Sequence, residues 1–211
     1  KFLLNIENES LAGLNDNEKL ALETLGARKP YTPPPLPQPE GPGRKWTVES
    51  VLAAAVKGMG KGSRNFDHGK RTFAAARCVI CHRFDGDGGA TGPDLTQAAG
   101  RFKLKDLVEA IVEPSKAVSD QYQAHVIQTS RGKVYTGRII SENEKEITVV
   151  TDPEDATKFV VLKRDEIEEM FAANQSLMPA GLLDQLNEAE VLDLVAYTLS
   201  RGNRRDGRFK R

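Results

Sequence analysis

The sequence is short of several residue types that ordinarily build a core or a charged surface. Only two cysteines and three histidines occur in 211 residues, and aromatic side chains make up 6% of the chain. Hydrophobic residues account for 39%, so something other than side chains could fill part of the core. Lysine plus arginine equals aspartate plus glutamate at 30 each. This balance argues against a nucleic-acid binder, which carries a basic excess.

Long apolar runs are also missing. No stretch approaches the roughly 20 apolar residues that a membrane-spanning helix needs. The opening KFLLNI is too short for the apolar core of a signal peptide. If the protein is exported, its signal was removed or lies outside this chain.

Proline content divides the chain. Residues 1–29 are polar and helical in pattern, with Asp16 as an expected cap and Gly26 as an expected stop. Seven prolines then follow between Pro30 and Pro42, which excludes a helix or a central strand. We therefore expect an extended linker over 30–45 and a main body over 46–211.

Helical and strand-like patterns alternate in the main body. Helices are expected over 47–58, from a cap at Asn65 or Asp67 through RCVICHRF, over 103–112 and over 182–200. Between the last two lie YQAHVIQTS, KVYTGRIIS, EITVVT and KFVVLK, which are short, β-branched and separated by turn residues. These predict a small antiparallel β unit at about 121–166, and DEIEEMF after it is expected to be helical.

Both cysteines lie in one stretch, Cys78-Val79-Ile80-Cys81-His82. This C-x-x-C-H spacing is typical of covalent c-type haem attachment. Cysteines at i and i+3 face the same side of a helical turn, so each can form a thioether with one vinyl group. His82 then supplies a neutral imidazole to the iron.

Other readings of this motif fit less well. A structural zinc site usually needs a second cysteine pair, and the chain has no third cysteine. A thioredoxin-like pair would follow a strand, whereas a helix is expected here. Because haem attachment consumes both thiols, no disulfide is expected.

A sixth iron ligand must come from elsewhere in the chain. Met178, in SLMPAG beside Pro179, is favoured because an irregular loop can aim its thioether at the iron. The other candidates are Met59, Met170, His68 and His125. His125 is the best substitute, whereas His68 is expected on the same helix as His82 and cannot easily reach the opposite haem face.

The segment TGPDL, residues 91–95, bears on how His82 is held. A ligating histidine normally donates its second ring N–H to a fixed acceptor. Pro93 is the expected source of that backbone carbonyl, and Leu95 would then pack against the macrocycle.

With these motifs in place, the chain strongly resembles class I cytochromes c. GKRTFAAARCVICH, GPDL, the Met-Pro loop and EAEVLDLVAYTL occur in the expected order. Gly69 and Phe73 match one side of that fold's helix crossing, and Leu194 and Tyr197 match the other. More narrowly, CHR, GPDLT, IVEPS, GKVYTG and SLMPAGL resemble the planctomycete and verrucomicrobial haem-binding domain, over about residues 64–200.

The resemblance implies a mainly α cytochrome c fold, with helices around one covalent haem c and an inserted SH3-like or Sm-like β unit. It implies iron held by His82 and Met178, and one-electron transfer rather than enzymatic catalysis. Haem is attached outside the cytoplasm, which implies a periplasmic or equivalent compartment. The expected partner is a redox protein, a respiratory partner or a fused dehydrogenase domain, without nucleic acid.

Two other functions stay open at this stage. Met178 could be displaced by a gas or peroxide, which would make the domain a haem sensor or enzyme. Alternatively, the haem could be auxiliary to an interaction module formed by the β unit and the N-terminal segment. The basic tail RGNRRDGRFKR is expected to be disordered.

Overall fold

The computed structural model describes residues 14–18 and 35–210 of the chain, which divides into two units, Lys1–Pro35 and Leu36–Arg211. Most of the predicted helical segment 1–29 and the first part of the predicted linker lie outside the described residues. Within the first unit, Asn15 Oδ1 accepts a hydrogen bond from the Glu18 N–H at 3.0 Å. Asn15, rather than Asp16, therefore makes the capping contact.

The second unit contains four longer helices where the periodicity predicts helices, but the last begins at Glu188 rather than at the predicted residue 182. They are α3 (Val48–Gly58), α4 (Phe66–Ala75), α6 (Leu104–Val112) and α7 (Glu188–Leu199). Thr47 and Asn187 close capping boxes at the starts of α3 and α7, and the Asn65 side chain caps α4. None of the helices in the described residues is both long and apolar enough to cross a membrane.

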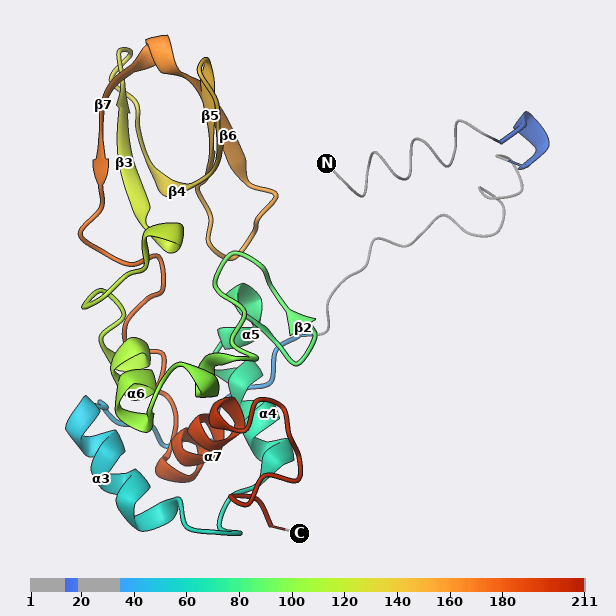
Figure 1. Ribbon diagram of the computed structural model, residues 1–211, viewed down its shortest axis with the longest axis vertical. Helices are drawn as coiled ribbons and strands as arrows, with labels where there is room; N and C mark the ends of the chain where they lie inside the picture. The colour runs from blue at the N-terminus through green and yellow to red at the C-terminus, as the bar shows by residue number, and fades with distance from the viewer. Residues whose placement is uncertain (1–13, 19–34, 211) are drawn as a thin grey trace. The chain divides into compact units, whose positions relative to one another are not determined.

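Helix α7 is the central helix of this core, since every residue from Glu190 to Thr198 is buried. Figure 1 shows α4 crossing it. Gly69 lies at the crossing, because a Cβ there would come within 2.4 Å of the Asp193 backbone oxygen and 2.7 Å of Tyr197 Cβ. Phe73 packs edge-on to Tyr197, with ring centroids 5.9 Å apart. These contacts match the crossing positions that the sequence suggested.

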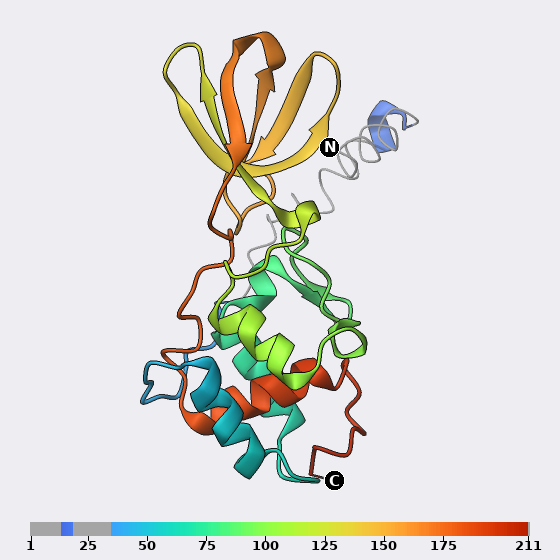
Figure 2. The ribbon, with the colours of Figure 1, turned by 60° about the vertical axis from the view of Figure 1, so that its left-hand side comes forward.

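Five strands form one antiparallel sheet in the order β6-β5-β4-β3-β7. They are β3 (Ala124–Thr129), β4 (Val134–Glu142), β5 (Glu146–Val150), β6 (Phe159–Lys163) and β7 (Ile167–Ala172). Register shifts interrupt the β3–β7 and β4–β5 pairs, and such bulges bend a sheet. The strong curvature is visible in Figure 2, and its inner side buries Ile127, Ile147, Val149 and Leu162.

The fifth strand corrects two predictions. Residues 167–172 form β7 rather than a helix, and the sheet therefore extends past the predicted end of the β unit at 166. Glutamate and methionine favour a helix, but pairing with β3 overrides that preference, since Met170 lies opposite Ile127. Met170 is 39% exposed, so it does not pack on the apolar helix face that was expected.

The described part of the proline-rich segment, 35–45, has no helix or strand, but it is not a free linker. Glu40 N–H and Gly41 N–H both donate to the Glu190 carboxylate on α7, at 2.7 and 3.2 Å. Trp46 is buried and donates its indole N–H to Leu186 O at 3.1 Å. The second unit therefore begins at Leu36, ten residues before the predicted start.

The C-terminal tail is also ordered in its described part, 201–210, contrary to the prediction of disorder. Phe209 is 4% exposed and packs edge-on to Phe66, with centroids 5.2 Å apart. The backbone of Arg64 exchanges hydrogen bonds with Arg208 and Lys210. One aromatic side chain therefore anchors a segment whose other residues are mostly charged or glycine.

Candidate functional site

The cysteine-containing segment forms a separate helical turn, α5 (Cys78–Cys81), rather than continuing α4. Helix α4 ends at Ala75, and Arg77 adopts the left-handed conformation with φ of 65°. This break corrects the expectation that His68 and His82 share one helix. Because of this break, α5 is a separate helical turn and does not continue the axis of α4.

The two thiols and His82 are placed by that turn. His82 is the C-cap of α5, with an extended backbone, and its N–H donates to Cys78 O at 2.9 Å. Cys78 and Cys81 are free and half-buried. Burial raises the pKa of the Cys78 thiol to about 12, so this sulfur is protonated at neutral pH.

The loop that follows α5 packs tightly against it. A short hairpin, β1 (Arg83–Phe84) with β2 (Asp87–Gly88), returns the chain, and Gly89 N–H then donates to Val79 O at 2.9 Å. Gly92 N–H donates to Cys81 O at 2.8 Å. A Cβ on Gly92 would lie 2.8 Å from His82 Cε1, so only glycine lets the backbone approach the imidazole this closely.

Next to Gly92, the Pro93 carbonyl fixes the His82 ring. His82 Nδ1 lies 2.8 Å from Pro93 O, and since a carbonyl can only accept, Nδ1 carries the proton. Burial lowers the pKa of His82, and the hydrogen bond to Pro93 only partly offsets this. The imidazole is therefore neutral, with Nε2 left as a lone-pair donor of the kind that metals bind.

The loop between β5 and β6 contacts this site, which the sequence did not predict. Pro153 O accepts hydrogen bonds from Cys81 Sγ at 3.2 Å and from Thr91 Oγ1 at 2.6 Å. The Arg77 guanidinium pairs with both oxygens of the Glu154 carboxylate, at 2.8 and 2.7 Å. Nothing in the local pattern around residue 153 indicates such a contact.

The other predicted site residues lie on different segments. Leu95 is half-buried against the aromatic cluster of Phe66, Phe73, Phe84, Tyr197 and Phe209. Met178 is half-buried in the irregular segment between β7 and α7, where its N–H donates to Ser176 Oγ at 3.1 Å. The structure thus brings Cys78, Cys81, His82 and Pro93 together, while ligation by Met178 stays a prediction.

The alternative sixth ligands have other surroundings. His68 Nδ1 lies 2.6 Å from an Asp193 carboxylate oxygen. His125 is half-buried on β3, and Met59 is the C-cap of α3 and packs against the core. Met170 is on β7.

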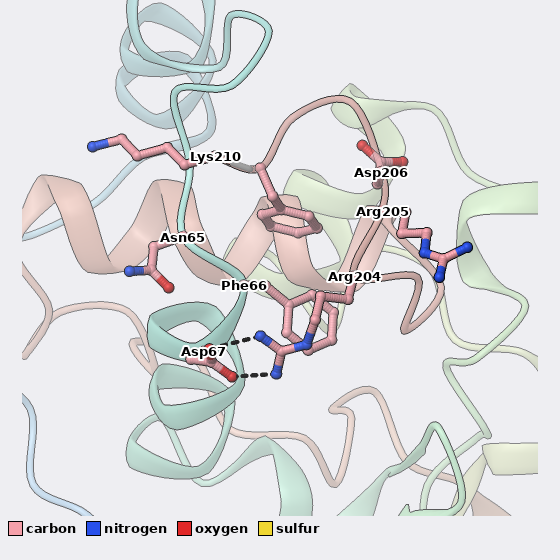
Figure 3. Close-up of a pocket in the computed structure, with 8 residues that line it drawn as sticks. Asn65, Phe66, Asp67, Arg204, Arg205, Asp206 and Lys210 are labelled. Atoms are coloured by element: carbon pink, nitrogen blue, oxygen red, sulfur yellow. Dashed lines mark hydrogen bonds and ion pairs between the residues drawn. The ribbon is translucent and has the colours of Figure 1, made fainter.

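A surface hollow of about 740 Å³ contains none of the predicted cofactor residues. It is lined by the start of α4 and by residues 204–210. Figure 3 shows the Arg204 guanidinium stacked beside the Phe66 ring and bonded to Asp67. This hollow is where the ordered tail meets α4, and its own arginine and aspartate satisfy each other.

The donor set around α5 fits a covalent haem c. Two free thiols sit at the ends of one helical turn, and the adjoining imidazole is neutral, oriented by a carbonyl and free at Nε2. The cysteines at the two ends of one helical turn and the fixed imidazole are what a c-type attachment turn needs, and this chemistry requires no fourth ligand of the kind that a structural zinc site has.

Comparison with known proteins agrees with this chemistry. Residues 66–146 match the family model described as Cytochrome c. No curated protein matches the chain. A cytochrome c domain is therefore present, and its cofactor is a covalently bound haem c with iron.

Proposed function

We propose that this protein carries single electrons through one haem c whose iron is held by His82 and Met178. The observation that carries the proposal is the His82 imidazole, fixed at 2.8 Å on Pro93 O and directly adjoining the turn with both cysteines. When bound, haem c exchanges one electron between Fe(II) and Fe(III). An iron with two axial protein ligands has no open position for oxygen or peroxide, which favours electron transfer over catalysis.

Each residue has a distinct role in the proposal. Cys78 and Cys81 form the thioethers, and His82 Nε2 ligates the iron while Pro93 O holds its ring. Leu95 contacts the macrocycle, and Met178 supplies a thioether from the opposite face. A methionine ligand and low solvent exposure both favour Fe(II) and raise the reduction potential.

The wider setting follows from the same proposal. Cytochrome c domains are typically exported, and we place this one in the periplasm or an equivalent compartment. It would serve an exported redox partner, or a dehydrogenase fused to the same polypeptide. The order of the sheet, in which β7 returns to pair with β3, supports an SH3-like or Sm-like insertion of the planctomycete and verrucomicrobial type.

The test of axial ligation compares two methionine variants of haem-loaded protein. Met178→Ala should abolish the methionine–iron charge-transfer band of the oxidised form and lower the reduction potential. Met170→Ala is the matched control, because Met170 lies on β7 with its side chain 39% exposed, and it should change neither property. A wild-type spectrum of five-coordinate high-spin iron, or a Met178→Ala spectrum identical to wild type, would refute the assignment.

A further inference from the structure

Away from α5, three segments bring a histidine and two carboxylates together. Glu40 comes from the irregular segment before α3, His68 from α4 and Glu190 from α7. One ligand atom from each, a histidine nitrogen and two carboxylate oxygens, lies within 4.8 Å of the other two. Glu190 is fully buried, His68 is half-buried and the Glu40 side chain is 50% exposed.

The His68 ring is oriented as metal-binding histidines are. Its Nδ1 lies 2.6 Å from Asp193 Oδ2, and a carboxylate on the second ring nitrogen fixes the tautomer and makes the free nitrogen a better ligand. Nε2, the free nitrogen, is buried and has no hydrogen-bond partner in the described residues. It lies 3.4 Å from Glu40 Oε1, but the two groups are not aligned for a hydrogen bond.

The charged side chains around the His68 ring include more negative than positive groups. Three carboxylates and two guanidiniums surround it: Glu40, Glu190 and Asp193, with Arg71 paired to Glu40 at 3.2 Å and Arg64 paired to Asp193 at 3.4 Å. Three negative and two positive groups leave a net charge of −1. Glu190 and Asp193 are the buried members of this group, and an unbalanced negative charge beside them favours binding of a cation.

The geometry suits a metal cation. Nε2 has no hydrogen-bond partner in the described residues, and its distance of 3.4 Å from Glu40 Oε1 is longer than a normal hydrogen bond. A cation would use Nε2 and the carboxylates together. Ligand atoms bound to zinc at about 2.0–2.1 Å in tetrahedral geometry lie roughly 3.4 Å apart, which is the observed separation of Nε2 from Glu40 Oε1.

The third ligand is also held in place. The Glu190 carboxylate accepts from the N–H groups of Glu40 at 2.7 Å, Asn187 at 2.9 Å and Gly41 at 3.2 Å. An ionised carboxylate has about four acceptor positions, so these three bonds orient it and leave one position for a metal.

We propose that Glu40, His68 and Glu190 bind a divalent cation of the zinc class, with Asp193 as the positioning residue for His68. The cation would link the segment around Glu40 to both α4 and α7, the two helices that cross in the core. This site shares no ligand with the haem, and the proposal is independent of electron transfer.

The experiment titrates Zn²⁺ into chelator-treated, haem-loaded protein by calorimetry. In that form His82 is occupied, which leaves His68 and His125 as the free histidines of the chain. One Zn²⁺ should bind per wild-type chain. His68→Gln and Glu40→Gln should each weaken binding at least tenfold, whereas the control His125→Gln should bind as wild type does.

Thermal unfolding gives a second readout. Zn²⁺ should raise the midpoint of wild type and of His125→Gln, and should raise that of Glu40→Gln less, because the stabilisation by a ligand falls as its affinity for the folded form falls. If His68→Gln does not fold, the half-exposed Glu40 still decides the question. Absence of stoichiometric binding, or equal affinity in wild type and Glu40→Gln, overturns the site, and the haem spectrum of each variant reports the proposed function separately.

Discussion

Replacing Gly92 tests how the neighbouring backbone holds the His82 ring in place. A Cβ at this position would lie 2.8 Å from His82 Cε1 and 2.9 Å from Nδ1. Carbon atoms in good contact are about 3.5 Å apart, so in Gly92→Ala the ring must move by about 0.7 Å. The Nδ1–Pro93 O contact is 2.8 Å in the native site, and a displacement of this size breaks it.

Loss of this hydrogen bond should raise the reduction potential of haem-loaded protein. If His82 ligates the iron as proposed, its N–H is more acidic when the iron is Fe(III), so the bond to Pro93 would favour the oxidised form. A net hydrogen bond contributes about 0.5–1.5 kcal/mol. Only the difference in strength of this bond between the two oxidation states changes the potential. Since a tenfold change in a one-electron equilibrium is about 59 mV, or roughly 1.4 kcal/mol, the upward shift should be at most about 60 mV.

Spectroelectrochemical titration measures this shift directly. Gly100→Ala is the matched control, because a Cβ on Gly100 meets no heavy atom within 4 Å. The reduction potential of this variant should equal that of wild type. A Gly92→Ala potential that is unchanged or lower than wild type would contradict the argument, provided that the absorption spectrum still shows attached, low-spin haem.

Three further predictions concern the core. Gly69→Ala should lower the free energy of unfolding in urea by about 2 kcal/mol. The new Cβ would lie 2.4 Å from the Asp193 backbone oxygen, and this clash outweighs the roughly 1 kcal/mol by which a helix prefers alanine to glycine. A more stable variant would refute the close crossing of α4 and α7 at Gly69. Burial raises the pKa of Tyr197 to about 12 from 10.0. Since the folded state holds this proton more tightly, the associated stability is complete below about pH 10 and is lost as pH rises towards 12, and Tyr197→Phe should remove that alkaline loss. Phe209→Ala should cost about 3 kcal/mol if the tail is anchored as described, whereas a disordered tail predicts no change.

The elements that sequence predicted correctly are those specified by neighbouring residues. Asn65 caps α4 through a contact to a residue three positions along, which a local pattern can reveal. The four strands β3 to β6 follow in the same way from alternation and turn residues. The cysteine turn is equally local, since its chemistry is contained within residues 78–82.

The errors arose where distant contacts decide the structure. Residues 167–172 form a strand because β3 pairs with them, and residues 40–41 are ordered because Glu190 accepts their N–H groups. The tail is ordered by the burial of Phe209, one aromatic residue among charges. None of these partners lies near its segment in the sequence, so periodicity and composition contain no signal for them.

The site shows the same division. The Pro93 contact was predictable because residue 93 follows the motif closely, and a ligating histidine needs an acceptor. The contacts from Pro153 and Glu154 join residues more than sixty positions apart, so no local pattern indicates them. Gly92 was identifiable only once the distance from its Cβ position to the His82 ring was known.

Haem attachment changes which contacts hold the β5–β6 loop against the region of α5. Thioether formation removes the Cys81 S–H, so the bond to Pro153 O at 3.2 Å must be lost. The Arg77–Glu154 pair has two half-exposed side chains, and exposed ion pairs typically contribute at most about 1 kcal/mol. Thr91 Oγ1, at 2.6 Å from the same carbonyl, is a hydroxyl that attachment does not consume. Thr91 therefore keeps the loop hydrogen-bonded to the attachment region once both thiols have reacted, alongside the Arg77–Glu154 ion pair.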